Sequence, residues 1–150
     1  MANRFDIHIQ TLLEADQRQT FKFMTFGFNP TIGVKGFQML VNMWLKCFLT
    51  PRGSDPTDLN YGTEFSDLIG SNVALEDARD VVLLAVNDCN EQLVSFQSED
   101  LTYTRSELLD SAEIIGFQED ASQPGFSVSI EIKNQAQERL EVNLPILSNE

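Results

Sequence analysis

Histidine and cysteine are scarce in this sequence, and the shortage narrows the chemistry that the chain can carry. The 150 residues include one histidine, His8, and two cysteines, Cys47 and Cys89. A catalytic Ser-His-Asp or Cys-His set could be built only through His8, which falls on the polar side of a predicted strand. Both cysteines lie within apolar helical patterns, which favours core thiols over a disulfide framework or a zinc site. We therefore expect no metal site, no cofactor, and assembly in a reducing cytoplasm.

Long apolar runs and nucleotide-binding glycine loops are also missing. The longest apolar stretch, around Trp44, is interrupted by Asn42 and Lys46 and is too short for a membrane span. The N-terminus lacks the basic-then-apolar pattern of a secretory signal. The glycines between residues 27 and 36 fit neither nucleotide-binding fingerprint. These absences point away from a membrane protein, a secreted protein and a phosphate-loop enzyme.

Basic residues are few, because the chain has 10 Lys and Arg against 23 Asp and Glu, for a net charge of −13. Residues 1–60 hold six basic and five acidic side chains (+1), whereas residues 61–150 hold four and eighteen (−14). Such a second part repels nucleic acid and anionic lipid and suits a partner with a basic face. A surface that only keeps the protein soluble is the alternative. We expect no nucleic-acid partner and no membrane.

Residues 1–30 differ from the rest and are predicted to form an N-terminal arm, whereas residues 31–150 are predicted to form one domain. In the arm, apolar and polar residues alternate over residues 5–10 and again around Phe21 and Phe23, which indicates strands. So much aromatic surface is rarely left in water. The arm therefore either folds back on the core or docks on a partner.

Two helices are predicted next. In residues 31–48, apolar side chains recur at three- and four-residue steps, and Gln38, Asn42 and Lys46 form the polar face. Pro51 ends this helix. After a loop and one or two helical turns between Glu64 and Ile69, a second helix is expected from Leu75 to Phe96. Its predicted buried stripe is Ala78, Val82, Ala85, Val86, Cys89, Leu93 and Phe96.

The last third changes to the period of strands. After a polar connection over residues 98–111, strands are expected from Ile114, over 126–133, and over 140–147. The regular middle strand is predicted to be the central one, and Pro145 suits an edge. The helices must cover the apolar face of this sheet. The fold class is therefore α+β, with two main helices packed on a three-stranded antiparallel C-terminal sheet and an N-terminal arm.

The stretch between the two helices carries a recognisable set of residues. They are Leu49, Thr50, Arg52, Gly53, Pro56, Tyr61, Gly62 and Phe65. This set resembles the loop of the baseplate wedge family that initiates the sheath in contractile phage tails, a family often labelled lysozyme-like. The order of elements over residues 32–147 is similar as well.

The resemblance implies a structural protein of the virion, in the inner tail baseplate. It implies about six copies against the tail tube protein and other baseplate wedge proteins, with strands offered to the first ring of tail sheath protein. Type VI secretion baseplate components and a small anti-adaptor share the fold, and both functions stay open; sheath and tube genes next to this one would favour the phage. In the family a Glu-Pro-Arg segment ends the second helix, and the matching Glu91-Gln92-Leu93 keeps only the glutamate.

The candidate partner-binding residues come from the loop, the second helix, the arm and the last strand. Arg52 is expected to pair with acids of its own domain or of a neighbour, and the Tyr61 ring to pack against the helices. The last strand is expected to accept a strand of the sheath. The full set is Arg52, Tyr61, Glu91, Phe21, Phe23, Leu140, Val142 and Leu144.

A lysozyme-like glycoside hydrolase is the enzymatic alternative. Glycoside hydrolysis needs two carboxylates on either side of a sugar bond. Glu64 and Asp67 lie next to the loop, but acids on a surface are common and only Tyr61 offers an aromatic wall. We therefore expect no enzyme, and a muralytic assay on the pure protein would test this expectation.

Overall fold

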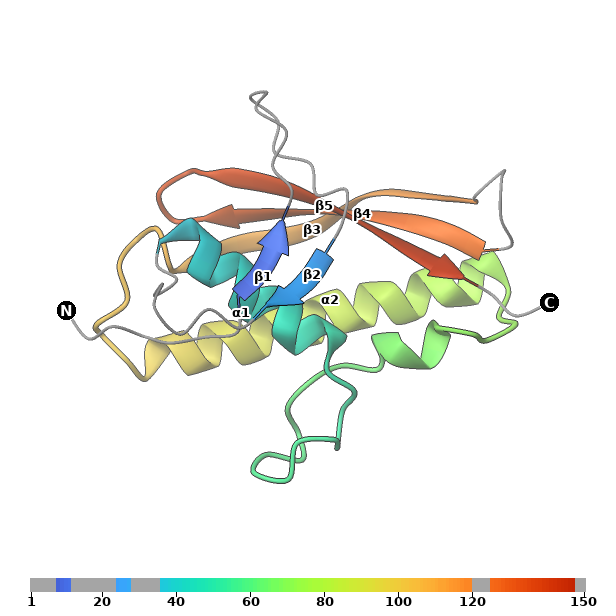
Figure 1. Cartoon of the computed structure of the whole chain (residues 1–150), viewed down its shortest axis with the longest axis horizontal. Helices are drawn as coiled ribbons and strands as arrows, with labels where there is room; N and C mark the ends of the chain where they lie inside the picture. Colours follow the sequence, from blue (N-terminus) through green and yellow to red (C-terminus); the bar gives the residue numbers. More distant parts are fainter. Residues whose placement is uncertain (1–7, 12–23, 28–35, 120–124, 148–150) are drawn as a thin grey trace.

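The computed structural model describes residues 8–11, 24–27, 36–119 and 125–147. The main body has two layers, because two helices pack on one face of a three-stranded antiparallel sheet (Figure 1). This arrangement confirms the predicted α+β class and the predicted order of elements. In chain order the main elements are α1 (Phe37–Leu49), the 3-10 helix η1 (Phe65–Leu68), α2 (Leu75–Ser98), β3 (Leu109–Glu119), β4 (Gly125–Asn134) and β5 (Arg139–Leu147).

Two short strands of the N-terminal part form a separate sheet. β1 (His8–Thr11) pairs antiparallel with β2 (Met24–Gly27). Within the described residues, neither strand pairs with the sheet of β3, β4 and β5. Phe21 and Phe23 of the predicted arm lie outside the described residues.

α1 forms the centre of the core because most of its 13 residues are apolar and buried. Trp44 and Phe48 are fully buried, and their rings stack at 4.8 Å between centroids. A helix that is apolar on nearly all sides is typical of one that is covered from several directions. The predicted polar face is therefore wrong at Asn42, which is 1% exposed and whose Oδ1 accepts a hydrogen bond from Gln38 Nε2 at 2.9 Å.

α2 presents the predicted apolar stripe to the core, with one error at its end. Ala78 and Ala85 are buried, as expected for small residues where another helix approaches. Phe96, however, is 57% exposed, whereas Gln97 is 4% exposed. The Gln97 amide explains the exchange, because its Nε2 donates to the carbonyl of Glu107 at 2.7 Å and its Oε1 accepts from the amide of Leu109 at 2.9 Å.

The sheet has the predicted central strand, because its order is β3-β4-β5. Alternate residues of β4 and β5 face the helices and are buried, for example Ile130 and Val142. β3 begins at Leu109, inside the stretch expected to be a connection. Register shifts between Leu109 and Ser111 and between Ile114 and Gly116 interrupt its alternation. This irregularity hides the start of the strand from a period-two pattern.

Candidate functional site

The loop of residues 50–64 is closed at its base by hydrogen bonds. The amide of Arg52 donates to the carbonyl of Thr63 at 3.1 Å, and the amide of Thr63 donates to the carbonyl of Thr50 at 3.0 Å. The Thr63 hydroxyl donates to the carbonyl of Phe48 at 2.6 Å, which ties the loop to the end of α1. These bonds satisfy backbone groups that a loop would otherwise leave to water. The base of the loop therefore belongs to the core.

Gly62 is held by the side chain of Gln92 from α2. The Gly62 amide donates to Gln92 Oε1 at 3.0 Å, and Gln92 Nε2 donates to the Gly62 carbonyl at 2.9 Å. Gly62 has φ 100°, and a Cβ there would lie 2.3 Å from the carbonyl oxygen of Thr50. Only glycine fits both the backbone conformation and the space. Gly62 of the loop motif is therefore required by the fold itself.

Arg52 pairs with acids of its own domain, which is the first of the two alternatives expected for it. Its Nη2 lies 2.6 Å from Asp88 Oδ2 of α2, and its Nη1 lies 3.8 Å from Glu64 Oε1. The Arg52 and Asp88 side chains are 37% and 36% exposed, so solvent screens the pair. Arg52 thus connects the base of the loop to α2 at the surface.

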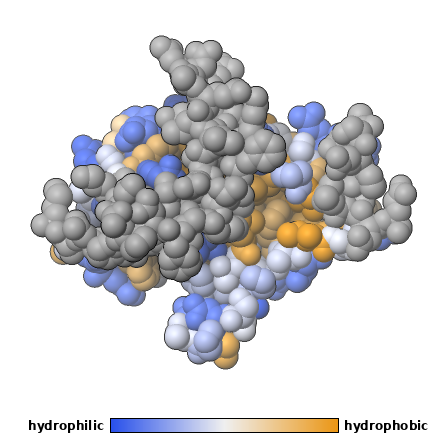
Figure 2. All heavy atoms as spheres, viewed as in Figure 1, coloured by the Kyte–Doolittle hydropathy of each residue, from blue (hydrophilic) through white to orange (hydrophobic). Residues whose placement is uncertain are grey.

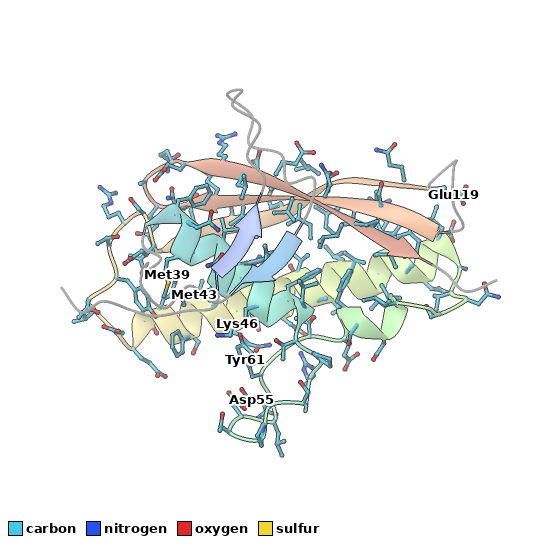
Figure 3. The ribbon with its side chains drawn as sticks, in the orientation of Figure 1. Met39, Met43, Lys46, Asp55, Tyr61 and Glu119 are labelled. Atoms are coloured by element: carbon cyan, nitrogen blue, oxygen red, sulfur yellow. The ribbon has the colours of Figure 1, made fainter. Side chains whose placement is uncertain are left out.

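Tyr61 and Glu91, which are far apart in the sequence, line one hollow of about 880 Å³ between α1, the loop and the C-terminal half of α2. Figure 3 shows Met39, Met43 and Lys46 in succession along α1 toward Tyr61. Tyr61 also packs against the core, as predicted. Met39 and Met43 give the hollow part of its apolar lining. The acids that line it are Asp58, Glu91, Glu99 and Asp100.

The position of Glu91 differs from that of the family segment with which it was matched. α2 continues to Ser98, so Glu91 lies inside the helix, about two turns before its end. Its side chain is exposed at the rim of the hollow. The glutamate is therefore available to a partner, but it does not mark the end of the second helix.

The acids of the hollow do not form the pair that glycoside hydrolysis requires. That chemistry needs one carboxylic acid kept protonated in an apolar pocket, opposite a second carboxylate. Asp58, Glu91 and Glu99 are exposed and Asp100 is half-buried, and neither Glu64 nor Asp67 of η1 is among the lining residues. The described residues also contain no group of three or more His, Cys, Asp or Glu that could hold a metal ion. The geometry lends no support to an enzymatic site here.

The two cysteines are free and buried where α1 meets α2, which confirms that they are core thiols. Cys89 Sγ donates to the carbonyl of Trp44 at 3.4 Å, and Cys47 Sγ donates to Gln92 Oε1 at 3.5 Å. Burial raises the pKa of the Cys89 thiol, whereas the hydrogen bond with Cys89 lowers the pKa of Cys47. The Cys47 thiol therefore adjoins the amide that holds the loop.

The amide side chains of α2 are the residues that the sequence reasoning missed. Asn90 Oδ1 accepts from Trp44 Nε1 at 2.8 Å, and Asn90 Nδ2 donates to the carbonyl of Ala112 at 2.9 Å. Asn90 thus joins α1, α2 and β3, while Gln92 holds the loop. The sequence position of these amides is the signal that could have found them. Asn90 directly follows Cys89, and Gln92 directly precedes Leu93, and both neighbours belong to the buried stripe.

The turn before β5 shows which of its residues direct their backbone N–H and C=O groups toward β4 and which direct them outward. The amide of Asn134 donates to the carbonyl of Glu138 at 3.1 Å, and the pairing register continues from there without a shift. Bonded and non-bonded pairs alternate along an antiparallel ladder. The even-numbered residues of β5 therefore bond to β4, and Arg139, Glu141 and Asn143 direct their N–H and C=O groups outward.

Three candidate partner-binding residues of β5 point inward. Leu140, Val142 and Leu144 are 3%, 2% and 7% exposed, because their side chains face the helices. Their backbone groups pair with β4, so these residues form the inner side of the edge strand. Pro145 lies at an outward position, where its missing N–H takes nothing from the ladder. No described strand pairs with this edge.

No family model matches the chain. No curated protein matches it either. None of the helices in the described ranges has the length and apolar character needed to cross a membrane. The loop, the hollow and the β5 edge are therefore the candidate functional features of the described residues.

Proposed function

We propose that the protein is a structural component of a contractile phage tail baseplate, and that it nucleates the sheath by adding a sheath strand to the edge of β5. Its partners are the tail sheath protein, the tail tube protein and other baseplate wedge proteins, around an assembly of about six copies. The resemblance of the loop and the order of the elements support the family. The open β5 edge supports the mode of binding.

The observation that carries the proposal is the difference between the two edges of the sheet. β3 has two register shifts, and such bulges are a common way to blunt an edge against pairing. β5 is paired to β4 in continuous register from Arg139 to Leu147, so its outer side is regular and has no bulge. A regular edge with unpaired N–H and C=O groups is what an added strand requires. β5 is therefore the edge to which the strand is added.

The loop and the hollow serve the other contacts of the baseplate. Hydrogen bonds to α1 and α2 fix the loop, so it presents one shape to a partner and loses little conformational entropy on binding. Tyr61 and Glu91 lie at the hollow beside it. Its acidic rim suits a wedge or tube protein with a basic surface.

Substitution of Asn143→Pro tests strand addition without removing a backbone hydrogen bond between β4 and β5. Asn143 directs its N–H outward, so proline removes one docking donor, together with the side-chain bond to Ser129. We expect a folded protein and baseplates that fail to acquire sheath, as seen by electron microscopy of assembled tails. Normal sheathed tails from this variant would contradict the proposal.

Two controls separate the edge from the fold. Asn143→Ala removes the side chain, which bonds to Ser129, but keeps the N–H, so its tails should be normal. Val142→Pro removes an N–H that the ladder uses and leaves a β4 carbonyl without its partner, so it should cost about 1–3 kcal/mol of folding free energy. A folded Val142→Pro protein of normal stability would show that the assignment of inward and outward residues is wrong.

A further inference from the structure

Three glutamates lie in a row across the sheet. Glu113 of β3 is directly opposite Glu131 of β4, and Glu131 is directly opposite Glu141 of β5. Their neighbours in β4 and β5 are buried against the helices, so this row lies on the other, solvent-facing side. Like charges directly opposite each other destabilise a sheet. Rules of this kind are most often broken where a protein has a function to serve.

The cations near the row compensate only its middle member. Arg139 Nη1 lies 3.8 Å from Glu131 Oε1, and Lys133 pairs instead with Asp110 at 3.4 Å. Within the described ranges, the side chains of Glu113 and Glu141 have no ion pair. The row therefore ends at the open edge of β5 with an uncompensated carboxylate.

A strand added to this edge would extend the row by one residue. Glu141 directs its N–H and C=O outward, so an antiparallel partner forms a bonded pair with it. The two Cβ atoms of such a pair are about 5.5 Å apart on the same face. The next residues of the added strand on either side point to the opposite face, beside Leu140 and Val142. Figure 2 shows apolar residues gathered on that side, between the sheet and α2 near the end of β5.

We propose that Glu141 selects the register of the incoming strand, which carries a lysine or arginine directly opposite it and an apolar residue on each side. This inference rests on the proposed strand addition at β5 and names the partner's sequence pattern. A slip of one residue would place the cation on the apolar face. A slip of two residues would place it opposite Arg139, which repels it, or opposite Asn143, which is neutral. Glu141 and Arg139 together therefore favour one alignment.

Short synthetic peptides can test this selection on the full chain. The probes are nine-residue peptides in which valine alternates with threonine, with lysine, glutamine or glutamate at the central polar position. Their symmetric pattern keeps the central residue in place for either strand direction. We expect the lysine peptide to bind about fivefold more tightly than the glutamate peptide at low salt, with glutamine between them. Added salt should reduce the difference.

Charge reversal supplies the matched variants. Glu141→Lys should reverse the preference, so that the glutamate peptide binds more tightly. Glu113→Lys makes the same charge change on the same face but two strands away, so it should keep most of the preference for lysine. Equal binding of all three peptides, abolished by Asn143→Pro, would overturn the charge selection and leave strand addition intact.

Two further results would also overturn the inference. A lysine preference that survives Asn143→Pro would come from the acidic surface at large and not from Glu141. Failure of every peptide to bind, with Asn143→Pro also leaving tail assembly unchanged, would remove strand addition at β5 together with the inference.

Discussion

The loop of residues 50–64 and the edge of β5 lie on opposite sides of the helix layer, and they differ in how their backbone groups are used (Figure 1). In the loop, the backbone of Gly62 bonds to Gln92 of α2. Thr63 bonds to Phe48 of α1 and to the backbone of Thr50. At the β5 edge, outward groups such as those of Glu141 meet no described strand. The contacts described for the loop are made within the chain, whereas no described strand pairs with the edge. The loop therefore stabilises the fold, and the β5 edge is the candidate place for an added strand.

This difference predicts two classes of variant. Changes in the loop should lower the stability of the isolated protein, because they remove contacts that hold the fold. Changes at outward positions of β5 should leave stability nearly intact and reduce assembly. Among the loop contacts, the expected loss of stability is largest for Gly62, intermediate for Gln92 and smallest for Arg52.

Gly62→Ala should have the largest effect. The alanine Cβ would meet the Thr50 carbonyl oxygen at 2.3 Å, and the φ of 100° is unfavourable for any residue with a Cβ. Because the obstacle is backbone, we expect a loss of about 3 kcal/mol or more in the free energy of unfolding, measured with urea. Gly53→Ala is the matched control, since its φ is 82° but its nearest neighbour is 4.0 Å away.

Gly53→Ala separates the effect of the close contact with Thr50 from the effect of the positive φ, because only the positive φ is present at Gly53. Gly53→Ala should cost about 1 kcal/mol, the usual penalty of a left-handed conformation. Equal losses for the two variants would show that the contact between Gly62 and Thr50 does not hold the loop.

Gln92→Ala should have an intermediate effect. It removes both hydrogen bonds to Gly62 and leaves a partly buried N–H and C=O without partners, which costs about 2 kcal/mol. The loop would also loosen over Cys47, so this thiol should react faster with an alkylating reagent. Glu91→Ala, at the adjacent exposed position, should change neither measurement. Unchanged stability and reactivity in Gln92→Ala would mean that the loop is held by its base alone.

Much of the fold follows from side-chain periodicity, because burial repeats every two residues in a strand and every three or four in a helix. The prediction fails where a tertiary contact shifts that repeat. β3 was missed at its start because its bulges break the alternation, and Gln97 replaced Phe96 in the core because its amide binds the backbone before β3. Inside α1, the periodicity also failed at Asn42, which was placed on the polar face but is buried.

The candidate site was predictable to the extent that it is local. The composition of residues 49–65 indicates an ordered loop, and Pro145 alone marks an edge strand and its outward side. The Gln92–Gly62 pair joins residues 30 positions apart, so no local pattern could reveal it. Likewise, the row that ends at Glu141 depends on the exact register of three strands.

Arg52→Ala should have the smallest effect on stability. The ion pair with Asp88 is short, at 2.6 Å, but both side chains are more than a third exposed, and exposed pairs contribute up to about 1 kcal/mol. A double-mutant cycle with Asp88→Asn should give a coupling energy in that range, and added salt should lower it. Because the Arg52 amide, which bonds to Thr63, is untouched, the loop should keep its shape. We still expect Arg52→Ala to hinder tail assembly, since the guanidinium lies at the surface where loop and α2 meet. Normal tails from this variant would restrict Arg52 to its internal ion pairs and leave β5 as the only tested docking edge.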